Sequence, residues 1–123
     1  MFISVLGINA QRPTASQKTS AAFNAKQLSS LSDEDLRWKN FIADNMCVIS
    51  EMPEEKTSGL ATIDLGSQSQ CTTESFNPLL LNIQPLADSH QYFKIAGSSN
   101  ALFVYSKARL EIMYQRTNKN NKK

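Results

Sequence analysis

The sequence predicts a small single α+β domain, in which helices pack on a mostly antiparallel sheet of about four strands. Three observations support this fold class. The chain has 123 residues, a usual length for one domain. Its hydrophobic fraction of 41% and charged fraction of 20% are ordinary for a folded protein. Helical and strand-like patterns alternate along the chain in the order helix, two strands, short helix, two strands, helix.

The first helix is predicted over residues 33–45. Ser32 is a natural N-cap, and Leu31 and Leu36 stand at the two positions of a hydrophobic staple. Apolar residues recur at helical spacing on one face: Trp38, Phe41, Ile42 and Met46. The acidic run Asp33-Glu34-Asp35 is favourable at the helix N-terminus, where the helix dipole is positive. Capping therefore accounts for these carboxylates without a catalytic role.

Two strands and a short helix are predicted next. Residues 46–52 and 60–65 are rich in branched and apolar residues that suit strands, and residues 53–59 between them form a turn or loop. Residues 66–73 are polar and predicted to be a surface loop. Asn77 and Pro78 are typical of a helix start, so a short helix should run to Ile83.

The clearest local signal is a hairpin. Residues 90–96 and 101–106 are strand-like, and Gly97-Ser98-Ser99-Asn100 between them is typical of a turn. Ser106 then caps a last helix to about Arg116, with an apolar stripe of Leu110, Met113 and Tyr114 at helical spacing.

The N-terminal residues 1–10 are apolar and uncharged up to Ile8 and end in Asn9-Ala10, followed by Gln11. An apolar run followed by a small residue is typical of the end of a secretory signal peptide. The sequence Asn9-Ala10-Gln11 resembles the signal-peptide ends of exported proteins in the Bacteroidota, and this resemblance implies a periplasmic or secreted protein. The alternative is a buried strand over residues 2–8 of a cytoplasmic protein. The run is too short for a membrane span, which takes about 20 apolar residues.

These patterns give a predicted domain organisation. Residues 1–10 are the remnant of a signal peptide, residues 11–31 are a linker that turns into a weak helix, residues 32–117 are the α+β domain, and residues 118–123 are a basic tail. The linker assignment rests on a composition rich in Ser, Thr, Ala, Gln and Lys with few apolar anchors.

Export also bears on the two cysteines. Disulfides persist in the periplasm and outside the cell but rarely in the cytosol. Cys47 and Cys71 are the only cysteines, so a disulfide between them is expected for an exported protein. In a cytosolic protein each would be a small buried hydrophobe.

No residue pattern points to catalysis, a cofactor or a metal. His90 is the single histidine, and the spacing of paired Cys or His ligands that zinc sites use is absent from the sequence. The four glycines are scattered, so there is no glycine-rich phosphate loop. We therefore expect a non-enzymatic protein with no catalytic, cofactor-binding or metal-binding residues.

Nucleic-acid binding is disfavoured but stays open. The net charge is only +2, although six basic residues against a single Glu lie in residues 107–123. Aromatic residues on the hairpin, namely Tyr92, Phe93, Phe103 and Tyr105, offer base-stacking surfaces.

The leading functional hypothesis is a small exported accessory or protein-binding domain, such as a component of a cell-envelope assembly. Because aromatic residues are enriched in interface cores, Tyr92, Phe103 and Tyr105 are the predicted protein-binding residues. Two alternatives remain: an intracellular nucleic-acid-binding module that uses the basic C-terminus, and an immunity-like or inhibitor-like protein. The partner is expected to be another protein.

Overall fold

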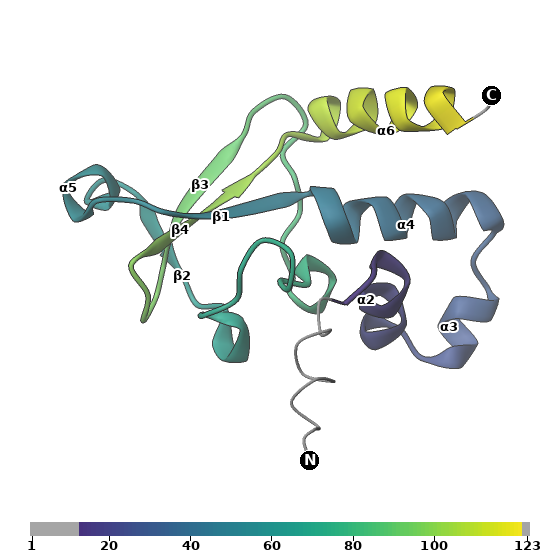
Figure 1. Ribbon diagram of the computed structural model, residues 1–123, viewed down its shortest axis with the longest axis horizontal. Helices are drawn as coiled ribbons and strands as arrows, with labels where there is room; N and C mark the ends of the chain where they lie inside the picture. The colour runs from purple at the N-terminus through teal and green to yellow at the C-terminus, as the bar shows by residue number, and fades with distance from the viewer. Residues whose placement is uncertain (1–12, 122–123) are drawn as a thin grey trace, which may run out of the picture.

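A computed structural model of the chain describes residues 13–121, with side chains described to residue 117 (Figure 1). The predicted α+β class is confirmed, with helices and a four-stranded mixed sheet. In chain order the elements are α2 (Ala15–Ala22), α3 (Ala25–Ser29), α4 (Asp33–Asn45), β1 (Cys47–Glu51), α5 (Glu54–Thr57), β2 (Ala61–Ile63), the 3₁₀ helices η1 (Gly66–Gln68) and η2 (Pro78–Leu80), β3 (Gln91–Ile95), β4 (Asn100–Val104) and α6 (Lys107–Asn121).

The sheet has the strand order β1-β4-β3-β2. The hairpin prediction is confirmed, because β3 and β4 pair antiparallel with Gln91 opposite Val104. Gly97 in its turn has a φ of +77°, which a residue with a side chain rarely adopts. β1 pairs antiparallel with the other edge of β4, whereas β2 pairs parallel with β3. The sheet is therefore mostly antiparallel, as predicted, with one parallel pair.

Helix α4 has the predicted bounds. The hydroxyl of Ser32 accepts the backbone N–H of Asp35 at 3.1 Å, which is the expected N-cap bond. In Figure 1, α4 and α6 extend side by side from one end of the sheet. Aromatic contacts join the two helices, with the rings of Trp38 and Phe41 at 5.0 and 5.2 Å from the ring of Tyr114.

Residues 11–31 are predicted as a linker that turns into a weak helix, whereas their described part, from residue 13, forms two capped helices. Thr14 and Asn24 each form a complete capping box, and these boxes start α2 and α3. Helix α2 packs against α4 (Figure 1), and its residues Lys18 and Thr19 are buried. This segment is therefore part of the domain, because capping and tertiary packing compensate for its weak apolar pattern.

Other boundaries also differ from the prediction. Helix α6 continues past Arg116 to Asn121, because no Gly or Pro ends it, so residues 118–121 of the predicted tail are helical. The loop over residues 53–59 contains the short helix α5, and the short helix after Asn77 is a single 3₁₀ turn. The predicted signal-peptide remnant, residues 1–10, lies outside the described residues.

The core forms on the inner face of the sheet. Ile95, Leu102 and Val104 are fully buried there, and Leu110 of α6 joins them. The long connection between β2 and β3 adds Leu65 and Phe76 to the same cluster. This connection therefore covers the inner face, and the side chains that alternate with the core residues point to the outer face.

Candidate protein-binding surface

Strand register brings aromatic residues together on the outer face of the sheet. Tyr92 on β3 lies opposite Phe103 on β4, and Phe103 also lies opposite Val48 on β1. Each alternates with a residue whose side chain points to the core. His90 precedes Tyr92 by two residues, and Tyr105 follows Phe103 by two residues. Both lie at the end of the sheet where α6 begins.

These four residues form the aromatic face: His90, Tyr92, Phe103 and Tyr105. The ring of Phe103 is central, with its centroid 4.8 Å from Tyr105, 4.9 Å from Tyr92 and 5.0 Å from His90. The rings are tilted or perpendicular to one another, with interplanar angles of 53° to 80° around Phe103. Such arrangements are favourable because the edge of one ring meets the face of another.

The structure thus places the three predicted contact residues, Tyr92, Phe103 and Tyr105, side by side. His90 was not predicted to join them. Its Nδ1 accepts the backbone N–H of Ser106 at 3.0 Å, and this bond fixes the imidazole beside Phe103 and Tyr105. The antiparallel register of β3 and β4 produces this neighbourhood, and sequence spacing alone does not specify the register.

Exposure differs across the aromatic face. Tyr92 is 50% exposed, one of the most exposed large hydrophobic side chains in the described part of the chain. Phe103 and Tyr105 are half-buried. His90 is also exposed. Tyr92 and His90 are therefore the side chains that a partner would reach first, and Phe103 lies beside both of them.

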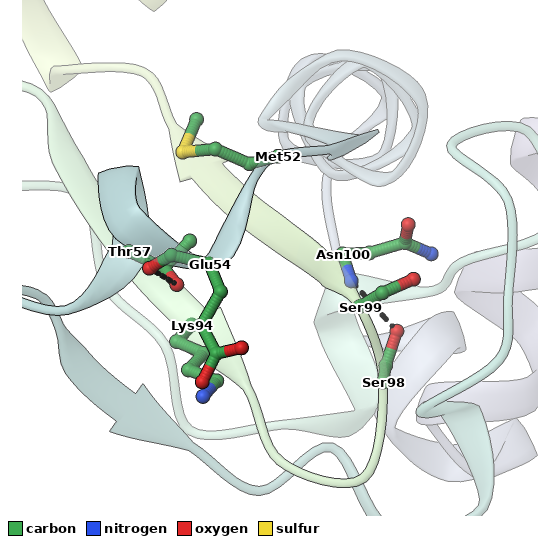
Figure 2. Close-up of a pocket in the computed structure, with 7 residues that line it drawn as sticks. All are labelled: Met52, Glu54, Thr57, Lys94, Ser98, Ser99 and Asn100. Atoms are coloured by element: carbon green, nitrogen blue, oxygen red, sulfur yellow. Dashed lines mark hydrogen bonds between the residues drawn. The ribbon is translucent and has the colours of Figure 1, made fainter.

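The other half of the outer face is covered. The connection from β1 to β2 carries α5, and Thr57 on this helix is buried, as is Ala101 on β4. A hollow of about 270 Å³ lies here, and Figure 2 shows Glu54 and Thr57 above Lys94, with Ser98 at the hairpin turn. This connection thus covers part of the outer face near the hairpin turn and leaves the aromatic end open.

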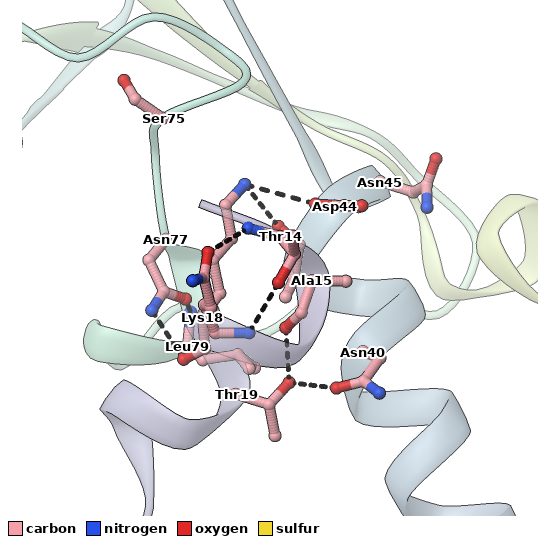
Figure 3. A network of polar contacts seen from close by, with 12 residues as sticks. Thr14, Ala15, Lys18, Thr19, Asn40, Asp44, Asn45, Ser75, Asn77 and Leu79 are labelled. Atoms are coloured by element: carbon pink, nitrogen blue, oxygen red, sulfur yellow. Dashed lines mark hydrogen bonds and ion pairs between the residues drawn. The ribbon is translucent and has the colours of Figure 1, made fainter. Parts of the chain in front are cut away.

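Away from the aromatic face, a cluster of polar contacts lies where α2 meets α4 (Figure 3). The Nζ of Lys18 is 3.4 Å from both the carbonyl oxygen of Ala43 and a carboxylate oxygen of Asp44, and Lys18 is only 2% exposed. Asn77 donates to the carbonyl oxygen of Lys18 at 2.8 Å. These contacts join three segments that are distant in sequence. The cluster therefore holds α2 on the domain and has a structural role.

A disulfide between Cys47 and Cys71 was expected, but both cysteines are free in the structure. Thr73 is hydrogen-bonded to Ile49 in the middle of β1. Gln70 reaches the carbonyl oxygen of Gly97 in the hairpin turn, near the end of β1, while Glu74 lines a hollow with Asn45 at the beginning of β1. The segment therefore runs antiparallel to β1 and carries Cys71 away from Cys47.

Each thiol instead packs with apolar side chains. Cys47 belongs to the buried core, and Cys71 is half-buried against it. Burial raises the pKa of the Cys47 thiol to about 12, with a smaller opposing influence from the nearby Lys18 ammonium. Cys47 is thus a protonated, unreactive thiol at neutral pH.

In the described part of the chain, no group of three or more His, Cys, Asp and Glu side chains is placed to hold a metal ion. Among the helices between residues 13 and 121, none combines the length and apolar composition that crossing a membrane requires.

Comparison with known proteins finds no matching family model, no matching curated protein and no matching solved structure.

Proposed function

We propose that this protein is a small binding protein that contacts another protein through the aromatic face. The observation that supports the proposal is the half-exposed ring of Tyr92 on a preformed aromatic cluster. An aromatic side chain with few rotatable bonds loses little conformational entropy when a partner covers it. A rigid support under Tyr92 reduces that loss further.

The same geometry favours a protein over a nucleic acid as the partner. Base stacking needs a free ring face, and the rings around Phe103 turn edges and faces toward one another. Phe103 is half-buried under its three neighbours. The aromatic face therefore offers two exposed rings, those of Tyr92 and His90, which both contact the half-buried Phe103, rather than a row of parallel stacking platforms.

Export places the proposed partner in the cell envelope or outside the cell. This part of the proposal rests on the resemblance of residues Asn9-Ala10-Gln11 to a signal-peptide end, outside the described residues. The role is then that of an accessory protein in an envelope assembly, without catalysis of its own.

The experiment is site-specific photo-crosslinking in the native host. A photoreactive phenylalanine analogue replaces Tyr92 in one strain and Leu80 in a matched control, because Leu80 is similarly exposed, at 52%, but lies on η2. We expect one discrete protein adduct from position 92, competed by wild-type protein but not by a Tyr92→Ser variant. No adduct at position 92 would contradict the proposal, and an adduct removed by nuclease would show a nucleic-acid partner.

A further inference from the structure

The edge of β1 carries an unusual contact. Among residues 13–121, β1 is an edge strand, because β4 is the one described strand that pairs with it. Unpaired N–H and C=O groups on such an edge can pair with a strand of another chain. At Ile49, the central residue of β1, the N–H donates to the hydroxyl oxygen of Thr73 at 2.8 Å, and the C=O accepts from the same hydroxyl at 3.1 Å.

One side chain therefore satisfies both backbone groups of Ile49. A hydroxyl has one donor and two acceptor sites, so Thr73 can make both bonds at once. Among the described residues, these are the hydrogen bonds that join the segment around Thr73 to β1. The hydrogen bonds that hold this segment against the β1 edge thus depend on a single hydroxyl group.

We propose that the hydroxyl group of Thr73 prevents the β1 edge from pairing with the β1 edge of a second copy of this chain. When the hydroxyl is absent, the segment around Thr73 is no longer bonded to β1 and moves aside. The freed N–H and C=O of Ile49 then pair with those of Ile49 in a second molecule, in an antiparallel arrangement about a two-fold axis. The sheets of the two molecules then join across their β1 strands.

The sequence of β1 suits this self-pairing. With Ile49 opposite its own copy, Val48 lies opposite Ser50, and Cys47 lies opposite Glu51. No like charges face each other, so the electrostatic penalty of opposed charges does not arise. The other edge strand, β2, has only three residues and offers a shorter row of backbone groups.

The test compares Thr73→Val and Thr73→Ala with Thr73→Ser. Val keeps the branched shape without the hydroxyl, Ala removes it without placing a methyl group against Ile49, and Ser keeps it. Sedimentation velocity over about a hundredfold range of concentration measures association. We expect the Val and Ala variants to dimerise as concentration rises, while wild type and the Ser variant stay monomeric.

Hydrogen exchange at the Ile49 amide identifies the interface. In the Val and Ala variants this amide should exchange rapidly at low concentration and become protected at high concentration. Two results would overturn the proposal: monomers at every concentration despite fast exchange at Ile49, or dimers in which Ile49 stays unprotected. A Ser variant that dimerises like the Val variant would also overturn it. This test is independent of the aromatic face and of any partner bound there.

Discussion

Tyr92 and Phe103 lie directly opposite each other on β3 and β4, and their ring centroids are 4.9 Å apart. The two residues nevertheless differ in what surrounds them. Tyr92 is half-exposed at the surface, whereas Phe103 is half-buried and contacts three aromatic rings. Substitutions at the two positions should therefore separate binding from stability.

The first prediction concerns the stability of these two variants. Phe103→Ala should lower the free energy of unfolding by about 2–3 kcal/mol, because it removes a ring that three others contact. Tyr92→Ser should change it by less than about 1 kcal/mol, because half of that side chain is already exposed to solvent. Urea denaturation measures both. Equal losses at the two positions would mean that Tyr92 is a core residue rather than a contact residue.

The second prediction concerns pH and Cys47. The pKa of this thiol is raised to about 12 in the folded protein and is about 8.5 in an unfolded chain. As pH rises above the unfolded value, only the unfolded state loses the proton, so stability falls by about 1.4 kcal/mol per pH unit until the folded pKa is reached.

Unfolding in urea at pH 8 and pH 10 measures this dependence in wild type and in Cys47→Ala. Both proteins share their other titrating groups, so the difference between their pH slopes reports Cys47. Equal slopes would show that the thiol ionises in the folded state, contrary to its burial. Iodoacetamide should in turn label Cys71 in the folded protein and Cys47 only after unfolding.

The third prediction concerns Lys18 and tests whether α2 belongs to the domain. Lys18→Ala should lower the free energy of unfolding by about 1–3 kcal/mol, since it removes a buried ammonium that contacts Ala43 and Asp44. Lys26→Ala in α3 is the matched control, because Lys26 is exposed. If the two variants are equally stable, α2 contributes little to the fold, as the linker hypothesis had it.

How far sequence predicts this structure depends on how local each signal is. The start of helix α4 was predicted correctly because Ser32 and the residues after it specify it locally. The hairpin followed from its turn residues in the same way. The capping boxes at Thr14 and Asn24 were equally local, but the weak apolar pattern of residues 12–31 obscured them.

Tertiary features were less predictable. The sequence placed Tyr92, Phe103 and Tyr105 on a hairpin, but the contribution of His90 depends on strand register and on its bond to Ser106. The structure has the two cysteines of the predicted disulfide unbonded, and the direction of the segment around Thr73, on which their separation depends, follows from long-range contacts. Spacing along the chain carries no information on that direction.

The fourth prediction concerns export. Intact mass spectrometry of the protein from its native host, without reducing agent, should find a species that begins at Gln11 in the envelope fraction. Its mass should correspond to two free thiols, as in the structure. A cytoplasmic species that keeps residues 1–10 would contradict export. An envelope species lighter by two hydrogens would instead restore the disulfide between Cys47 and Cys71.

Binding of the purified partner protein to wild type, Tyr92→Ser and Leu80→Ser tests the central claim most directly. The partner is the protein that crosslinks to position 92, and isothermal titration calorimetry gives its dissociation constant. Loss of a central aromatic anchor should weaken binding at least about tenfold for Tyr92→Ser. Leu80→Ser should bind as wild type does. Wild-type affinity in the Tyr92→Ser variant would contradict the assignment of the aromatic face as the binding surface.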